Sequence, residues 1–352
     1  MASLCVGFQT ARRIGFPRDA GTFDLSRIKT SPFRRYFSGA ALALACAVPA
    51  LAWDAEGHAA VGLVAEHNLS AGARAHVIKI LGSDDLASIA SWMDQVRAAY
   101  FHQGPLGSDP EAMKFNAEFP KNGEWHYVDL PLGLEAYTLD GPFSRPDDVV
   151  HKIEEAVSVL EGGGDKRITT REALCMLVHF VGDEHQPLHV GNGFFHIGAD
   201  GSASLVMDPV AAKGLPNDKG GNADFFGPGK YDELHAYWDT NLVQKVAGSK
   251  DPAVVAGVLN GLVAREGTTW KSTGDYHHWP EGWATESLVA ARTAYGPVTF
   301  GAEKPDTRGG IKSIQITLSG TYDAVCIPVA EERLAKAGFH LAEILNAIQW
   351  SD

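Results

Sequence analysis

The sequence predicts a mainly α-helical single domain that follows a short leader. Apolar residues recur at a spacing near 3.6 in nine stretches, which Gly or Pro breaks separate. A strand-like pattern is confined to residues 125–130 and 311–318, and the chain contains no internal repeat. The expected helices cover residues 55–68, 71–81, 84–97, 146–161, 168–185, 231–247, 251–264, 281–295 and 328–348.

The composition supports a substantial core and an acidic surface. Of the 352 residues, 45% are hydrophobic, which is ordinary for a globular protein. The chain has 30 Lys and Arg and 43 Asp and Glu; residues 1–52 hold seven and two of these, which leaves 23 and 41 and a formal charge of −18. Such a surface repels a nucleic-acid backbone unless divalent cations supply positive charge locally.

Residues 1–52 have the features of a leader that is removed. An arginine pair precedes an uncharged apolar run, and residues 50–52 have the small-x-small form of a signal-peptidase site. Both the general and the twin-arginine export routes remain open. The run is too short and too rich in Ala for a membrane span. We therefore expect a secreted or periplasmic protein whose mature domain, residues 53–352, begins at Trp53 and has no membrane span.

The cysteines do not form a disulfide framework. Two of the four lie in the leader, so Cys175 and Cys326 remain in the mature chain. One bridge and two separate buried thiols are both compatible with the sequence, because Cys175 lies on the apolar side of an expected helix.

The stretch at residues 177–190, Leu-Val-His-Phe-Val-Gly-Asp-Glu-His-Gln-Pro-Leu-His-Val, is the centre of the predicted chemistry. His179 and Asp183 stand four residues apart on an expected helix, so both project from one face and could bind one metal ion. Pro187 cannot continue that helix, and the turn could bring His189 back toward its end. Imidazole and carboxylate ligands without a thiolate suit zinc. A single histidine on an apolar helix is as readily a hydrogen-bonded core residue.

Other parts of the chain supply further metal-capable side chains. His235 and Asp239 repeat the four-residue spacing on another expected helix, and chance explains two such helices less readily than one. Asp94 and His126 are weaker candidates individually. Asp94 could instead pair with Arg97 one turn along its helix, and His126 could be an ordinary strand residue.

The first residues of the mature chain offer another pair. Trp53 would ordinarily be a core aromatic, and His58 follows it by five residues. A free α-amine and its own carbonyl oxygen form a five-membered chelate, and the amine titrates near pH ~8, so a metal could displace its proton. Signal cleavage would then complete the site.

Two stretches rich in Gly, Pro and Asn, residues 101–124 and 191–230, are expected to be loops. Long irregular segments in compact domains are usually functional or disordered. Because the second loop begins two residues after His189, we expect it to border the site.

In order, spacing and residue type, the candidate ligands resemble those of the secreted three-zinc, single-strand-specific nucleases and 3'-nucleotidases of fungi and plants. This is the S-one/P-one (S1/P1) family, whose members are distant relatives of bacterial zinc phospholipase C. The resemblance runs from Trp53 to the C-terminal helix. It implies the helical zinc phospholipase C and nuclease-like fold with a few short strands, and three Zn²⁺ per chain. The implied ligands are Asp94, His126, His179 and Asp183 for one ion, Trp53, His58 and Asp183 for a second, and His189, His235 and Asp239 for the third.

The resemblance also implies a mechanism. Two zinc ions that share the Asp183 carboxylate, about 3.5–4 Å apart, can lower the pKa of a shared water and present hydroxide to phosphorus. The third ion would stabilise the leaving 3'-oxygen, and Arg97 would neutralise charge on the pentacovalent phosphorus. Asp94, Arg97 and Asp183 are thus the catalytic candidates.

Substrate recognition is implied at three further positions. The family places a base-stacking aromatic and a base-binding carboxylate where Tyr127 and Asp129 lie, and stacking requires unpaired bases. A packed strand aromatic is an equal alternative for Tyr127. Asn222, in a Gly-Gly-Asn segment, is expected to orient the phosphate. The segment between His189 and this motif is longer than the family usually needs.

These features predict a secreted zinc-dependent phosphodiesterase that hydrolyses single-stranded RNA and DNA to 5'-nucleotides, with 3'-nucleotidase activity left open. No stable protein partner is implied. A phospholipase C would share the scaffold, but Asp239 stands where those enzymes resemble a His-x-x-x-Glu pattern. A non-catalytic zinc-binding secreted protein is the other alternative, and Arg97 beside a complete ligand set argues against it.

Overall fold

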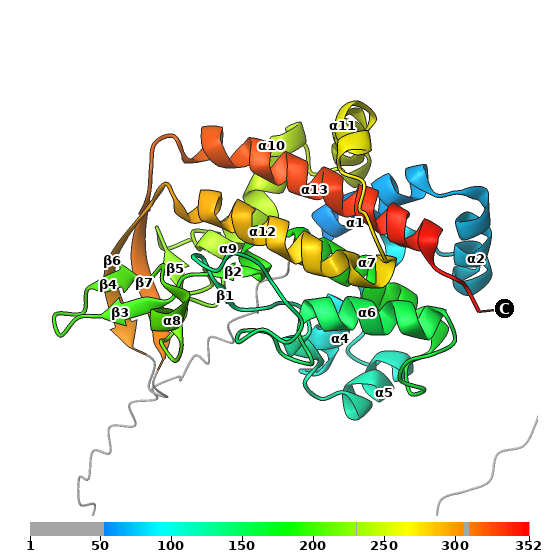
Figure 1. Ribbon diagram of the computed structural model, residues 1–352, viewed down its shortest axis with the longest axis horizontal. Coiled ribbons are helices and arrows are strands. Elements are labelled where there is room, and N and C mark those ends of the chain that lie inside the picture. The colour runs from blue at the N-terminus through cyan, green and yellow to red at the C-terminus, as the bar shows by residue number, and fades with distance from the viewer. Residues whose placement is uncertain (1–52, 230, 306–309, 352) are drawn as a thin grey trace, which may run out of the picture. The chain divides into compact units, whose positions relative to one another are not determined.

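The computed structural model describes residues 53–229, 231–305 and 310–351, so the expected leader lies outside the described residues. As predicted, the fold is mainly α with a few short strands (Figure 1). None of the helices in the described ranges is both long and apolar enough to cross a membrane.

The α-helices are α1 (Asp54–Asn68), α2 (Ala71–Leu81), α3 (Leu86–Ile89), α4 (Trp92–Ala99), α5 (Pro110–Glu118), α6 (Val149–Leu160), α7 (Thr170–His185), α8 (Pro209–Ala212), α9 (Leu234–Ala236), α10 (Val243–Ala247), α11 (Pro252–Glu266), α12 (Trp279–Tyr295) and α13 (Tyr322–Ala347). The 3₁₀ turns are η1 (Asn122–Glu124), η2 (Pro187–His189), η4 (Gly267–Thr269) and η5 (Tyr276–His278), and a π-helical segment, η3 (Tyr237–Leu242), joins α9 to α10. The strands are β1 (Leu130–Pro131), β2 (Gly191–Asn192), β3 (Phe195–Ile197), β4 (Ala203–Leu205), β5 (Asp224–Phe225), β6 (Val298–Pro305) and β7 (Ile311–Leu318).

Helix α7 is the buried axis of the domain. Every residue from Glu172 to His185 is buried, and α6, α13, α12 and α4 pack around it. A helix that is enclosed on all sides has no solvent-facing stripe and needs its ends fixed from within. Thr169 caps the N-terminus, because its hydroxyl accepts the Glu172 N–H and the Glu172 carboxylate accepts the Thr169 N–H. The capped helix holds its C-terminal turn at a defined place in the core.

Helices α1 and α13 pack closely across a glycine. A Cβ atom added at Gly338 would lie 2.5 Å from the Val64 Cβ, so only a glycine lets the two backbones approach this far. Helix α13 begins at Tyr322, whereas residue 328 was expected as its start, and Pro328 lies inside it. Tyr322 and Cys326 are buried, and this packing outweighs the one hydrogen bond that a proline removes.

Further expected elements differ in the structure. The helix expected at 84–97 is broken into α3 and α4, since the Ala90 carbonyl at the break accepts a hydrogen bond from His179. The expected loop 101–124 contains α5, which Asp109 caps and Pro110 starts. Of the expected strand 125–130, only Leu130 lies in a strand, the two-residue β1.

The strands tie the irregular segments to the helices. The parallel pair β1–β2 aligns Leu130 with Gly191, which brings the chain after His126 alongside the chain after His189. β7, expected from the sequence, pairs with β6 and with β5, and β5 lies in the expected loop 191–230, as do the short strands β2, β3 and β4. Both sides of the site are therefore joined by backbone hydrogen bonds.

The two cysteines of the expected mature chain are separate thiols and do not form a disulfide. Cys175 and Cys326 are both buried and unbridged. Burial raises the pKa of each thiol to about 12, so both behave as small apolar groups.

The close α1–α13 packing predicts unequal effects of two alanine substitutions. Gly338→Ala should lower the free energy of unfolding by about 1–3 kcal/mol, because the new methyl group overpacks the contact with Val64. Gly282→Ala, on α12, should raise it by up to about 1 kcal/mol, since a Cβ there meets nothing within 4 Å and alanine favours the helix. Urea unfolding measures both; equal effects would contradict the close approach.

Candidate metal centre

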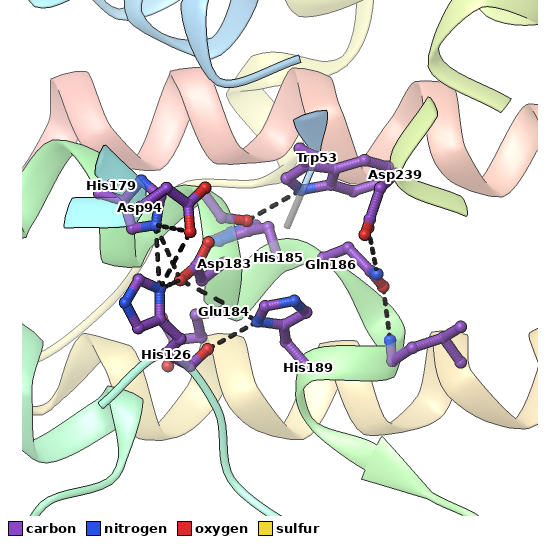
Figure 2. Close-up of polar contacts among 12 residues, drawn as sticks. Trp53, Asp94, His126, His179, Asp183, Glu184, His185, Gln186, His189 and Asp239 are labelled. Atoms are coloured by element: carbon purple, nitrogen blue, oxygen red, sulfur yellow. Dashed lines mark hydrogen bonds and ion pairs between the residues drawn. The ribbon is translucent and has the colours of Figure 1, made fainter. Parts of the chain in front are cut away.

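The C-terminal turn of α7 presents one carboxylate to three imidazoles. Asp183 Oδ1 lies 3.2 Å from His58 Nε2, and Asp183 Oδ2 lies 2.9 Å from His126 Nδ1 and 3.2 Å from His179 Nε2. All four side chains are buried. Burial alone would raise the pKa of Asp183, but the neighbouring imidazoles, led by His179, hold it well below its ordinary value. The carboxylate is therefore ionised and faces a different histidine group with each oxygen. Figure 2 shows its contacts with His126 and His179.

Asp94 closes one of these groups. Its Oδ1 lies 3.8 Å from both His126 Nδ1 and His179 Nε2, and those two nitrogens are 3.1 Å apart. Asp94 extends from α4, His179 from α7, and His126 from the segment that leads into β1. The predicted set of Asp94, His126, His179 and Asp183 is thus brought together from three parts of the chain.

A further group joins the turn after α7 to the helix α9. His189 Nε2 lies 3.0 Å from His235 Nε2, and His235 Nε2 lies 3.3 Å from Asp239 Oδ2. His235 lies in α9 and Asp239 in the π-helical segment η3. A π turn re-aims side chains within a helix and is common at functional sites.

Backbone carbonyls fix the orientation of the ligand histidines. In three of them Nδ1 faces a carbonyl oxygen and must donate its proton to it, which leaves Nε2 turned toward the site. The pairs are His179 with Ala90 at 2.7 Å, His189 with His126 at 2.6 Å, and His235 with Gly220 at 2.7 Å.

The facing nitrogens of His189 and His235 indicate a site for a cation. Burial lowers the pKa of His189 to about 3 and that of His235 to about 4, so both rings are neutral at pH 7. With Nδ1 of each ring protonated, both Nε2 atoms carry lone pairs, and these atoms are 3.0 Å apart. Two lone pairs at this distance repel each other unless a cation lies between them. The neutral imidazole is also the form that binds metals.

Gln186 orients Asp239 through a hydrogen bond. Its side-chain amide donates to Asp239 Oδ1 at 2.7 Å, while Asp239 Oδ2 is buried without a hydrogen-bond partner. Burial raises the pKa of Asp239 well above its ordinary value, and a bound cation would reverse that cost. Gln186 was not singled out from the sequence, because only the fold shows that it reaches η3.

Other buried ligand atoms are also unsatisfied. A buried polar atom without a partner costs free energy, and a metal ion would supply the missing interaction. Within the described ranges, the atoms without a hydrogen bond include both ring nitrogens of His58, Asp94 Oδ1, His126 Nε2 and Asp183 Oδ1. Donor type and burial therefore fit divalent metal ions such as zinc.

The Gly-Gly-Asn segment forms a turn against the metal-ligand region. Lys219, Gly220 and Gly221 have φ angles of 58°, 63° and 79°. A Cβ at Gly220 would lie 2.1 Å from the Leu188 carbonyl oxygen, so that position requires glycine. Asn222 donates its side-chain amide to the Lys219 carbonyl at 2.7 Å, which closes the turn. The turn thereby presents the Gly220 carbonyl to His235.

Trp53 is a buried aromatic at the end of α7. Its indole Nε1 donates to the Gly182 carbonyl at 2.9 Å, and its own carbonyl accepts the His58 N–H at 3.2 Å. Its φ of 33° is unusual for a residue with a side chain. The residue next to the predicted cleavage site is thus held beside Asp183.

Arg97 lies one turn after Asp94 on α4. The guanidinium is half-buried and forms no hydrogen bond or ion pair with any residue in the described part of the chain. Its charge helps burial to lower the pKa of His235. The alternative reading, an Asp94–Arg97 ion pair, is not what the structure forms. The cation is therefore free to meet an anion.

Tyr127 and Asp129 lie together under an arginine that sequence reasoning missed. Arg145 Nη1 lies 3.5 Å from Asp129 Oδ2, and its guanidinium lies over the Tyr127 ring at 5.1 Å. Burial raises the pKa of Asp129 despite Arg145 and a hydrogen bond from Asn217. Arg145 precedes α6 in an ordinary polar turn, so nothing local marks it.

Comparisons with known proteins agree with this geometry. Residues 53–349 match the family model described as S1/P1 nuclease. Endonuclease 1 of Arabidopsis thaliana is 26% identical over 331 residues, which are 86% of this chain and 89% of that protein. Nuclease P1 of Penicillium citrinum is 28% identical over 321 residues, 85% of this chain and 99% of that protein. Nuclease S1 of Aspergillus oryzae is 27% identical over 324 residues, 88% and 96% of the two chains.

Because the two carboxylate oxygens of Asp183 face different histidines, we expect substitutions of Asp183 and Asp239 to remove different numbers of metal ions. Asp183→Ala should remove about two metal ions per chain, because each carboxylate oxygen faces a separate group of histidines, whereas Asp239→Ala should remove about one. Glu332→Ala, which breaks a surface contact with Lys336 on α13, is the control and should keep the full metal content. Elemental analysis of folded protein gives the counts. Equal losses from the first two variants would show that Asp183 serves a single ion.

Proposed function

Because the chain belongs to the S1/P1 nuclease family and is therefore a hydrolase of phosphodiester bonds, we propose that it is a secreted, zinc-dependent nuclease specific for single strands. It hydrolyses RNA and DNA to 5'-nucleotides, and removal of 3'-phosphates from nucleotides is a second candidate activity. The observation that carries the metal requirement is the pair of facing, neutral His189 and His235 nitrogens.

The proposed ligand sets are those implied by the family resemblance. Asp94, His126, His179 and Asp183 would hold one zinc ion, Trp53, His58 and Asp183 the second, and His189, His235 and Asp239 the third. In the structure the ligand atoms of Asp94, His126 and His179 lie together, as do those of His58, His179 and Asp183 and those of His189, His235 and Asp239. When bound, zinc lowers the pKa of a coordinated water toward neutrality and neutralises charge on the phosphate. The division of the Asp183 oxygens between two groups of histidines supports the shared ligand.

The chain itself supplies the groups that bind and orient the substrate. Arg97, unpaired and within electrostatic reach of His235, is placed to neutralise charge that builds on the phosphate. Tyr127 offers its ring to a base, and Asp129 accepts hydrogen bonds from the base edge, with Arg145 holding both side chains. Asn222, whose amide nitrogen donates to the Lys219 carbonyl in the glycine turn, orients the phosphate.

Removal of the leader is part of the proposal. The family match begins at Trp53, which supports residues 53–352 as the mature domain. A cleaved chain would give Trp53 a free amine beside its carbonyl oxygen and would release the strained φ of 33° at this residue.

The first test is metal content and activity measured on one sample. The processed protein should contain about three zinc ions, cleave single strands faster than duplex, and lose that activity on chelation. Zinc addition should restore it. Zinc with activity on choline phospholipid and none on nucleic acid would instead establish a phospholipase C, and zinc with no hydrolysis at all would establish a binding protein.

A second test isolates Arg97. Arg97→Ala should lower kcat by about 10²–10³-fold while zinc content is unchanged, because the guanidinium contacts no ligand and stabilises only the charged phosphate. Arg97→Lys should recover part of the loss. Arg265→Ala, an exposed arginine on α11, is the matched control. A loss of zinc in Arg97→Ala would assign the residue to the metal site instead.

A further inference from the structure

An exposed aromatic pair stands at the end of the helix that carries Asp94 and Arg97. The side chains of Tyr100 and Phe101 are 52% and 59% exposed, although aromatic rings normally bury most of their area. Their rings touch edge to face, with centroids 5.1 Å apart. Isolated exposed apolar residues need no explanation, but two adjacent aromatics beside a functional site form a contact surface.

The aromatic pair directly follows α4, the helix that carries Asp94 and Arg97. Arg97 follows Asp94 by three residues on α4, and Tyr100 and Phe101 follow Arg97 by three and four, just after the helix ends at Ala99. Along the chain, Arg97 therefore lies between the proposed ligand Asp94 and the aromatic pair.

The backbone under the pair is well fixed. Tyr100 N–H donates to the Val96 carbonyl at 3.2 Å, and Phe101 N–H donates to the Ala98 carbonyl at 3.1 Å. The next residue, His102, adopts a φ of 54° and donates to Ala99 at 2.8 Å, which turns the chain away. The two rings therefore stand on a turn that is tied back to α4, and little ordering would be needed when a ligand binds.

The chemistry of the pair favours a nucleic-acid base as the occupant. Stacking is available to every base and requires no positive charge, which suits a protein of net charge −13. The adjacent Arg97 would meet the phosphate that precedes or follows that base. We propose that Tyr100 and Phe101 form a stacking surface for a base of the single strand beyond the nucleotide held at the metal centre. This inference rests on the proposed function.

The test is a length series of single-stranded oligonucleotides with the zinc-loaded enzyme. For Tyr100→Ala/Phe101→Ala, KM on a strand of about ten nucleotides should rise at least about fivefold, with kcat and zinc content retained, since one stacked base is lost. The rise should shrink as the strand shortens to a dinucleotide. It should be the same at low and high salt, because no charge is removed.

Two further variants separate stacking from structure. The exchange Tyr100→Phe/Phe101→Tyr keeps two rings and should restore the wild-type KM. Ile78→Ala removes an equally exposed apolar side chain, 57% exposed on α2, and should change nothing. Circular dichroism of each variant establishes that it is folded.

Four outcomes would overturn the inference. An unchanged KM on long strands, or an equal rise for dinucleotides and long strands, would refute it while leaving the proposed function intact. A loss of self-association in sedimentation with normal kinetics would identify a second copy of the chain as the occupant. Wild-type enzyme that cleaves no nucleic acid at any length would overturn the inference and the proposed function together.

Discussion

A carboxylate buried among imidazoles is the constraint on which the rest of the structure depends. Asp183 is removed from water and faces His58, His126 and His179 at 2.9 to 3.2 Å. Burial of an ionised group is costly unless it is paired on every side. The helix α7 must therefore be enclosed, capped and fixed in register, and α1 and the segment before β1 must each bring an imidazole to the same place.

The irregular segments of the fold, like the helices, position the metal-ligand histidines. The break between α3 and α4 frees the Ala90 carbonyl for His179, and the glycine turn presents the Gly220 carbonyl to His235. Both of these departures from regular structure thus supply an acceptor for a ligand histidine. Orienting groups of this kind set the tautomer of a metal ligand and are as much a part of the site as the ligands.

Much of this arrangement could be read from the sequence, because helical spacing is a local property. The pairs 179 with 183 and 235 with 239 lie together as the four-residue spacing predicts, and α2 has the predicted bounds. Contacts between distant segments could not be read in this way. Arg145 and Gln186 act through partners that only the folded chain brings near, and the start of α13 before Pro328 depends on buried packing rather than on propensity.

The hydrogen bond from His189 to the His126 carbonyl, 2.6 Å long, joins the two halves of the centre through the backbone. A substitution that shifts His126 therefore also moves the carbonyl group that orients the His189 ring. For protein engineering, the chain therefore has two kinds of segment. The metal-binding framework has to be kept or replaced as one unit, whereas exposed residues such as 100–105 and 196–200 lie outside it and can be exchanged separately.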